Sequence, residues 1–254
     1  MQKLTSKIRK ACEDYNLIST GDKIAVGVSG GKDSLTLLVC LANLRRFYPQ
    51  KFDLVAISVD MFNGESNFDD IKALCDKIGV EFYVVPSQIN NIVFKTRKET
   101  NPCSLCAKLR RGILNNFAKS IGCNKIALGH HKDDLIQTFF LSMFYEGRLS
   151  TFMPNIHLST VGLNVIRPMI YIDEKDIIAV SKKEKLPVMF NCCPANKKTE
   201  REHIKQIIDY IKHEIPISKE RTFKAIISDD RYNLFDKFRA NNMIDPERKS
   251  KKAS

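Results

Sequence analysis

The stretch IAVGVSGGKDSLTLL, residues Ile24–Leu38, decides the fold of this 254-residue chain. Small and β-branched residues precede Ser29 and an apolar run follows Ser34, so the pattern predicts a buried strand, a tight turn and a helix. Gly30 and Gly31 allow the turn to adopt backbone conformations with positive φ. Such a turn directs successive N–H groups and a helix N-terminus toward one point, which suits a bound phosphate.

Two charged residues complete the turn. Lys32 supplies a cation for the phosphate, whereas Asp33 would repel it unless Mg²⁺ lies between them. The hexapeptide SGGKDS lacks the G-x-x-x-x-G-K-S/T spacing of a Walker A loop and the G-x-G-x-x-G spacing of dinucleotide-binding folds. An alternative interpretation is a strand-to-helix turn of small residues that Asp33 caps. The complete hexapeptide at a strand–turn–helix junction favours phosphate binding.

The rest of the chain alternates between strand and helix patterns. Strands are expected at residues 23–28, 52–60, 81–86, 124–131 and 163–169. Helices are expected at residues 6–15, 33–47, 67–78, 104–121, 133–145, 173–185 and 199–213, with a last helix beyond Pro216. This rhythm predicts an α/β fold with a mostly parallel five-stranded sheet and helices on both faces.

The domain organisation follows from the same pattern. We expect a single catalytic domain over residues 1–215, which includes the N-terminal helix and an insert that carries cysteines. Residues 216–254 are expected to form a helical extension and a basic, disordered tail, because the ending PERKSKKAS is polar and charged.

The overall charge and the lack of membrane or export signals indicate the kind of partner and the cellular compartment. Lys and Arg outnumber Asp and Glu by 41 to 29, a net charge of +12, which favours a polyanionic partner without identifying it. No apolar run approaches the roughly 18 residues that a membrane span needs. The N-terminal MQKLTSKIRK lacks the apolar segment of a signal peptide. We therefore expect a cytoplasmic protein, without a membrane partner, whose thiols stay reduced.

A second polar motif, GHHKDD at Gly129–Asp134, lies at the expected end of the fourth strand. The carboxyl ends of parallel strands meet at one sheet edge, so these side chains are expected beside the phosphate loop. Carboxylates and imidazoles there can bind Mg²⁺ or position a nucleotide. Alternatively, Asp133 caps the following helix, and His130 or His131 is packed or solvated. We favour a functional role, and Asp133 over Asp134.

The eight cysteines divide into two groups. Four lie among apolar residues and are expected to be small buried hydrophobes. These are Cys12, Cys40, Cys75 and Cys123.

The other four cysteines lie beside element ends and near basic residues: Cys103 and Cys106 in CSLC, and Cys192 and Cys193 in NCCP. Zinc, an iron–sulfur cluster and a dithiol couple are all chemically possible. Adjacent cysteines make a poor zinc knuckle because their side chains diverge, so NCCP would supply one ligand and CSLC two. Three thiolates leave the fourth position of a metal site open, which favours catalysis over a closed structural site.

Several motifs resemble known families. SGGKDS is similar to the loop of the PP-loop pyrophosphatase superfamily, and GHHKDD resembles the GH-x-x-DD box of its tRNA-modifying members. The stretches CSLCAKLRRGIL, IALGHHKDDLIQTFFLSMFYEGRLSTFMP, VIRPMIYIDEKDI and CPANKKTERE resemble the tRNA 2-thiocytidine synthetase family. This resemblance extends from about Lys3 to about His213 and implies an adenine nucleotide alpha hydrolase-like fold.

The resemblance implies an ATP-dependent tRNA sulfurtransferase that thiolates cytidine 32 of the anticodon loop. ATP and Mg²⁺ would adenylylate O2 of the base, and sulfur held on a [4Fe-4S] cluster would then attack C2. The implied pyrophosphate-binding residues are Ser29, Gly30, Gly31, Lys32, Asp33 and Ser34. Asp60 would lie beside the adenosine, and Gly129, His130 and Asp133 would complete the ATP site.

The resemblance also implies cluster ligands and partners. The ligands would be Cys103, Cys106 and Cys193, with Cys192 as the alternative third ligand. Arg110, with Arg111, would steer tRNA phosphate or stabilise charge at the base, although a solvated helix face is the alternative. Lys32, Asp133 and Arg110 are thus the expected catalytic residues. The expected partners are tRNA, a sulfur donor (a cysteine desulfurase or sulfide) and a possible second copy of the chain.

Two other functions fit part of this pattern. One is another PP-loop tRNA ligase, of the lysidine type or a uridine-thiolating enzyme, in which the cysteines bind zinc. The other is a non-enzymatic iron–sulfur RNA-binding protein. The chain lacks the terminal zinc knuckles of the uridine enzymes, and intact SGGKDS and GHHKDD motifs argue against a loss of ATP chemistry.

Overall fold

The computed structural model describes residues 1–62, 64, 66–96, 102–189 and 200–228, with backbone alone for residues 94–96 and for Cys103. The described chain divides into two units, Met1–Tyr210 and a second that begins at Ile211. Because the division falls within one helix, the predicted domain boundary after residue 215 stays a prediction. The expected disordered tail lies outside the described residues.

One sheet organises the first unit. Its strands are β1 (Asp22–Gly27), β2 (Phe52–Asp60), β3 (Glu81–Pro86), β4 (Lys125–Ala127), β5 (Asn155–Leu158) and β6 (Leu163–Ile166). They are arranged in the order β3-β2-β1-β4-β6-β5, and every neighbouring pair is parallel except β5 with β6. The α/β class and the mostly parallel sheet are confirmed.

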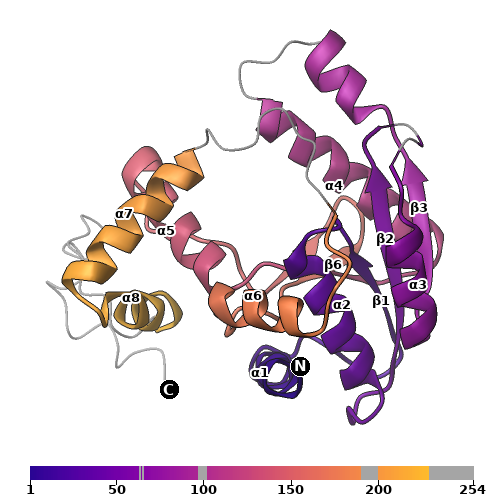
Figure 1. Ribbon diagram of the computed structural model, residues 1–254, viewed down its shortest axis with the longest axis horizontal. Coiled ribbons are helices and arrows are strands. Elements are labelled where there is room, and N and C mark those ends of the chain that lie inside the picture. The colour runs from indigo at the N-terminus through magenta and orange to yellow at the C-terminus, as the bar shows by residue number, and fades with distance from the viewer. Residues whose placement is uncertain (63, 65, 97–101, 190–199, 229–254) are drawn as a thin grey trace, which may run out of the picture. The chain divides into compact units, whose positions relative to one another are not determined.

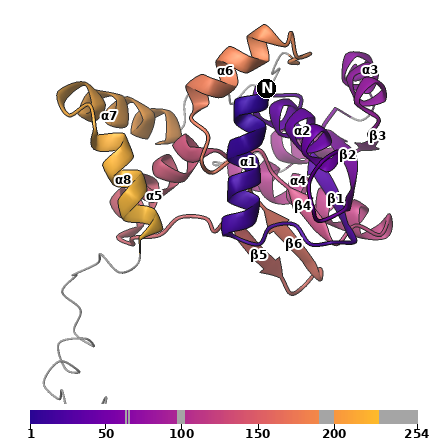
Figure 2. The same cartoon turned by 90° about the horizontal axis from the view of Figure 1, so that it is seen from below.

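The sheet has six strands rather than the five expected. The additional strand, β5, is a four-residue edge strand that forms a hairpin with β6 (Figure 2). The turn of the hairpin ends at Gly162, whose φ is 71°. A short and largely exposed strand lacks the apolar pattern by which the other strands were recognised.

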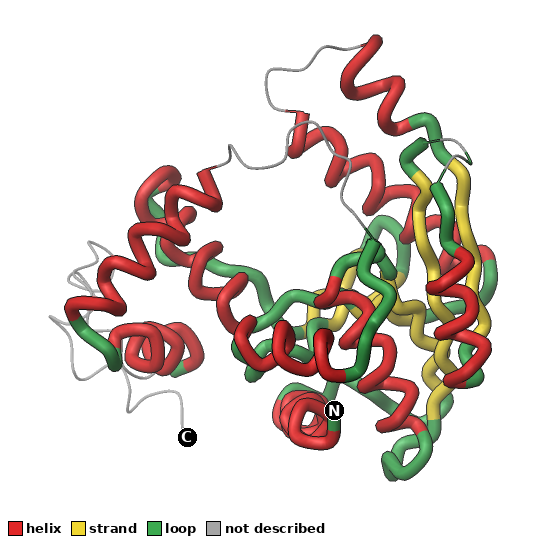
Figure 3. Tube along the Cα trace, in the orientation of Figure 1, coloured by secondary structure: helices red, strands yellow, loops and turns green. Residues whose placement is uncertain are grey.

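Helices of the first unit connect and cover the strands (Figures 1 and 3). The helices of the described chain are α1 (Gln2–Asp14), α2 (Lys32–Arg45), α3 (Asp69–Ile78), the π-helix η1 (Asn91–Thr96), α4 (Pro102–Ser120), α5 (Lys132–Glu146), α6 (Glu174–Lys183), α7 (Glu200–Glu214) and α8 (Ser218–Ile227). The π-helix was not predicted. Helix α4 begins at Pro102, two residues before its expected start, so both cysteines of the CSLC motif belong to the helix.

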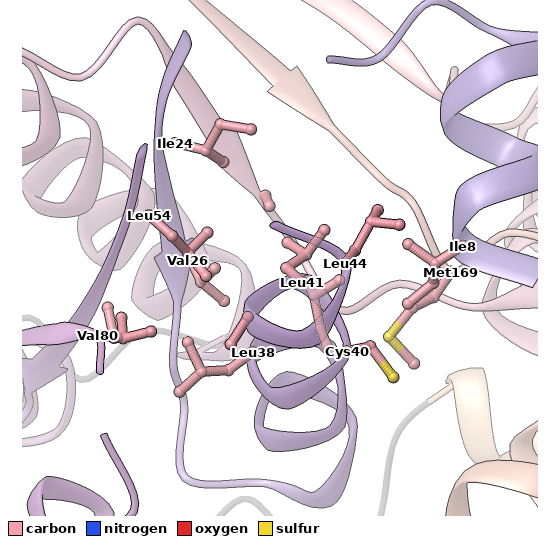
Figure 4. Close-up of a cluster of buried hydrophobic side chains, with 14 of the residues drawn as sticks. Ile8, Ile24, Val26, Leu38, Cys40, Leu41, Leu44, Leu54, Val80 and Met169 are labelled. Carbon is pink, nitrogen blue, oxygen red and sulfur yellow. The ribbon is translucent and has the colours of Figure 1, made fainter. Parts of the chain in front are cut away.

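Two hydrophobic cores cover the two faces of the sheet. Successive residues of a strand point to opposite faces, and Ile24 and Val26 of β1 join the core built on α2 (Figure 4). Ala25, between them, joins the other core with Leu114 and Ala118 of α4. Helices therefore cover both faces, as the sequence predicted.

The cysteines expected to be hydrophobic are all buried. Burial raises the pKa of Cys12 to about 12 and that of Cys40 and Cys75 to about 11, so these thiols are protonated at neutral pH. None of the helices in the described residues is long and apolar enough to span a membrane.

Candidate active site

The strand order reverses between β1 and β4. From β1 the chain continues to β2 and β3 on one side, and β4 leads to β6 on the other. In open α/β sheets, ligands bind outside the carboxyl ends of the strands at such a switch point. The loops that follow β1 and β4, which carry SGGKDS and GHHKDD, lie together there.

The phosphate loop is held in shape by its own hydrogen bonds. Gly30 has a φ of 78°, and Gly31 precedes the first residue of α2. The Ser29 N–H donates to Oγ of Ser34 at 3.1 Å, and that hydroxyl donates to the carbonyl of Gly31 at 3.0 Å. The N–H of Met189 donates to the carbonyl of Gly30 at 2.9 Å. The loop therefore has a defined conformation.

Lys32 lies at the first position of α2 between two carboxylates. Its Nζ is 3.2 Å from Oδ2 of Asp33 and 3.1 Å from Oε1 of Glu174. Burial lowers the pKa of Lys32, but the two carboxylates outweigh burial and the pKa is raised. Burial raises the pKa of Glu174, but the charges of Lys32 and Lys205 outweigh burial, and the pKa of Glu174 is lowered. The ammonium group stays charged and is held ready for an anion.

Asp33 has an unsatisfied oxygen. Its Oδ1 is buried and has no hydrogen-bond partner among the described residues, with Nε2 of His131 at 3.7 Å. Burial raises the pKa of Asp33, and the charges of Lys32 and His131 offset this only in part. Buried polar atoms are normally paired, so an orphaned carboxylate oxygen beside a phosphate loop fits a bound cation.

A magnesium ion is compatible with this arrangement. No group of three His, Cys, Asp or Glu side chains forms a ready ligand set in the part of the chain that the structure describes. Mg²⁺ commonly takes only one or two carboxylates, together with substrate phosphates and waters. The residues present therefore fit a cation that is held jointly by Asp33 and a nucleotide.

Gly129 brings the two loops into backbone contact. A Cβ at this position would lie 3.0 Å from the carbonyl carbon of Asp33 and 3.0 Å from the nitrogen of Ser34. Any other residue would push the loop after β4 away from the start of α2. Gly129 is thus needed for the close approach of the two loops, and its predicted place in an ATP site stays a prediction.

A Gly129→Ala variant should lose about 10- to 100-fold in kcat/KM for ATP, because small displacements of catalytic groups have effects of this size. Steady-state kinetics with varied ATP would measure it. Gly112→Ala is the matched control, since a Cβ there meets no atom within 4 Å. Equal kinetics for the two variants would contradict the role assigned to the contact.

The GHHKDD motif forms the start of α5. His131 is its N-cap: the Asp134 N–H donates to Nδ1 of His131 at 3.4 Å, and the His131 N–H donates to Oδ2 of Asp134 at 3.1 Å. Oδ2 of Asp133 instead accepts the N–H of Glu174 at 2.8 Å, the first residue of α6. The interpretation of Asp133 as the cap of its own helix is therefore wrong, and Asp133 links α5 to α6.

His130 lies in a different environment from its neighbour. Its ring centroid is 5.1 Å from that of Phe152, and its Nδ1 is buried without a partner among the described residues. Burial lowers the pKa of His130 to about 4, and the nearby charge of Arg167 contributes. His130 is therefore neutral at physiological pH.

Asp60 lies at the carboxyl end of β2, next to β1. Its carboxylate accepts hydrogen bonds from the Phe62 N–H at 3.0 Å, from the Ser66 hydroxyl at 2.6 Å and from the Gly64 N–H. Burial raises the pKa of Asp60, but these bonds outweigh burial and lower the pKa. The carboxylate thus orders the loop after β2, and the predicted contact with adenosine stays a prediction.

Of the predicted cluster ligands, the structure describes the side chain of Cys106. Its buried Sγ lies 3.6 Å from the sulfur of Met61, which follows β2, and accepts a hydrogen bond from Nη2 of Arg110 at 3.5 Å. Cys103 lies three residues earlier on α4. Cys192 and Cys193 lie outside the described residues, so the ligand set stays a prediction.

Two residues of this edge were not recognised from the sequence. Glu174 resembles any acidic residue in the first turn of a helix, so no sequence signal marked it. Arg167 follows β6 directly, and the reasoning applied to the end of the fourth strand could have identified it.

Known proteins resemble this chain in sequence and in fold. The PP-loop domain family matches residues 1–215. The tRNA-cytidine(32) 2-sulfurtransferase of Geobacter metallireducens is 36% identical over 239 residues, 93% of this chain and 93% of its own length. That of Alcanivorax borkumensis is 38% identical over 232 residues, 89% of this chain and 82% of its own.

A solved structure shares the fold. The U34-tRNA thiolase from Methanococcus maripaludis, with its [4Fe-4S] cluster, has a TM-score of 0.71 at 24% identity, and the match covers 89% of this chain and 76% of that one. At this identity the likeness shows the fold alone. The sequence relatives confirm the resemblance found in the motifs, and the chain therefore belongs to the PP-loop domain family and, within it, to the tRNA-cytidine(32) 2-sulfurtransferase family of enzymes.

Proposed function

We propose that this chain is an ATP-dependent tRNA sulfurtransferase that replaces O2 of cytidine 32 in the anticodon loop with sulfur. One observation carries the proposal: a preformed phosphate loop with an orphaned carboxylate oxygen lies at the switch point of the sheet. The function of relatives that match 93% and 89% of the chain, cytidine 32 thiolation, supports the choice of substrate.

The ATP site would act on the leaving pyrophosphate. O2 of the cytosine attacks the α-phosphorus of ATP, the bond to the bridging oxygen breaks, and pyrophosphate leaves. The N–H groups of the loop, the hydroxyls of Ser29 and Ser34, and the ammonium of Lys32 would hold the departing charge. Mg²⁺ bound at Asp33 would neutralise further charge, and Asp133 would fix the position of the α5 and α6 helix starts around the nucleotide.

The second half-reaction needs a sulfur nucleophile. Sulfur forms a bond to C2 of the adenylylated base, the C2–O2 bond breaks, and AMP leaves. A [4Fe-4S] cluster on Cys103, Cys106 and Cys193, or Cys192 in place of Cys193, would supply an iron with an open position for sulfur. Arg110, whose Nη2 lies 3.5 Å from Sγ of Cys106, would stabilise negative charge that develops at the base.

The remaining features of the enzyme belong to the same proposal. Residues 1–215 would form the catalytic domain, and residues 216–254 a helical extension with a basic tail. The enzyme would work in the cytoplasm, receive sulfur from a cysteine desulfurase or from sulfide, and form a homodimer. The target base must lie in a single-stranded loop, because a paired C2 carbonyl is hard to reach.

Deletion of the gene should remove 2-thiocytidine from tRNA, and a plasmid copy should restore it. Nucleoside mass spectrometry of bulk tRNA measures both. Persistence of 2-thiocytidine, or loss of a thiolated uridine or of lysidine instead, would contradict the proposal. A colourless, zinc-containing protein after anaerobic purification would exclude the iron–sulfur cluster.

A further inference from the structure

Two unpaired polar groups lie apart from the phosphate loop, after β4 and β6. Five buried side-chain atoms among the described residues have no hydrogen-bond partner, and two of them are Nε of Arg167 and Nδ1 of His130. Arg167 follows β6, and His130 follows the neighbouring strand β4. Both groups therefore belong to the same carboxyl edge of the sheet as the ATP site.

The guanidinium of Arg167 is held in place from two directions. Its carbon lies 4.9 Å from the ring centroid of Phe152, and its Nη1 donates to the carbonyl of Met153 at 2.6 Å. The other aromatic neighbour of Phe152 is His130, with ring centroids 5.1 Å apart. These contacts fix the orientation of the guanidinium and leave Nε without a partner in the described chain.

The charge of Arg167 is not balanced by a carboxylate. No Asp or Glu oxygen lies within 4.0 Å of its nitrogens in the described part of the chain, although most charged groups nearer the phosphate loop are paired. Burial lowers the pKa of Arg167 to about 10, and the neighbouring charge of Arg111 on α4 acts in the same direction. Buried charges are normally paired, so this arrangement lacks an anion.

We propose that Arg167 and Arg111 hold a phosphate of the RNA strand next to the target nucleotide. The inference rests on the proposed function, because it assigns a part of the substrate to this edge. A guanidinium forms paired, charge-assisted hydrogen bonds to phosphate oxygens. The phosphates of ATP already have a site at the loop after β1, whereas Arg111 lies on the exposed surface of α4. A polyanion can reach both arginines.

The two arginines would also orient the reacting base. The helix that carries Arg111 also carries Arg110, whose Nη2 contacts Sγ of Cys106. A backbone phosphate held by Arg167 and Arg111 would fix the adjoining nucleotide beside α4, the helix that also carries Cys106. Such contacts position RNA without reading its sequence.

An Arg167→Gln variant should bind an unmodified tRNA transcript with cytidine at position 32 about 10-fold more weakly, the size of one charge-assisted contact. The slope of log affinity against log salt should fall by about 1, and the KM for ATP should not change. Fluorescence anisotropy at four salt concentrations measures the affinity. Arg9→Gln, in an exposed ion pair with Glu13 on α1, is the control for a change of charge.

Two results would overturn the inference: a raised KM for ATP with unchanged tRNA affinity, or no change in either. If circular dichroism shows that Arg167→Gln does not fold, Arg111→Gln decides, because this exposed residue can be replaced without disturbing the core. Unchanged tRNA affinity in Arg111→Gln then overturns the inference. The proposed function is tested separately by thiolation with the wild-type enzyme, so its failure would be seen without any variant.

Discussion

Thiolation of cytidine 32 should fall about 100- to 1,000-fold in an Asp33→Asn variant that folds normally. The amide matches the carboxylate in shape but carries no negative charge for a cation beside the leaving pyrophosphate, and loss of one such electrostatic contact has effects of this order. Single-turnover assays with anaerobic enzyme, analysed by nucleoside mass spectrometry, would measure the decrease.

The same substitution should not lower the stability of the protein. Burial raises the pKa of Asp33 above its unfolded value, so the ionised carboxylate opposes folding once the pH rises through the folded pKa. Removal of that charge should leave the midpoint of urea unfolding at pH 7 unchanged or higher. Loss of activity without loss of stability is typical of a functional residue rather than a structural one.

Asp176→Asn is the matched control for Asp33→Asn. Asp176 lies on α6 and forms an ion pair with Lys7 of α1 at 3.0 Å. It should keep its activity and lose a small amount of stability. If Asp33→Asn kept more than a third of wild-type activity, the assignment of the cation to Asp33 would be wrong.

Cys106→Ala should abolish thiolation and remove iron from the protein, while ATP binding stays intact. The loss is expected to exceed about 1,000-fold, because the cluster would lose one of its three thiolates and with it the sulfur nucleophile. Iron and sulfide assays of anaerobic protein, calorimetry with ATP and nucleoside analysis would separate these effects. Cys123→Ala is the control, since Cys123 is a buried cysteine of the core on α4.

The outcome distinguishes two uses of the thiols. A Cys106→Ala protein that kept both iron and activity would show that Cys106 is not a ligand. One that kept its iron and lost only activity would favour a role of Cys106 in carrying sulfur as a persulfide.

Much of the fold could be predicted because its signals are local. The β1–turn–α2 pattern of SGGKDS depends on residues adjacent in sequence, and so do the apolar runs of β2 and β3. The edge strand β5 could not be predicted in the same way, since its pairing with β6 defines it and its own four residues carry no periodic pattern. The π-helix at Asn91–Thr96 likewise has no apolar repeat of its own.

The candidate site could likewise be predicted only where its residues are adjacent in sequence. Gly30 and Asp33 belong to one motif. The partner of both Lys32 and Asp133 is Glu174 of α6, which lies more than 40 residues after Asp133 in the chain. The contact between Gly129 and the backbone of Asp33 depends on strand order, which joins β1 and β4 across roughly 100 residues of chain. Contacts of this kind depend on tertiary packing, which a single sequence does not specify.

The self-bonded phosphate loop has a thermodynamic consequence. Oγ of Ser34 forms hydrogen bonds with the N–H and the hydroxyl of Ser29, and Gly129 packs against the start of α2. The loop therefore has little conformational entropy left to lose when a nucleotide binds. Preorganised sites bind at a smaller ordering cost. The free energy of nucleotide binding then remains available to orient the much larger and more flexible RNA substrate.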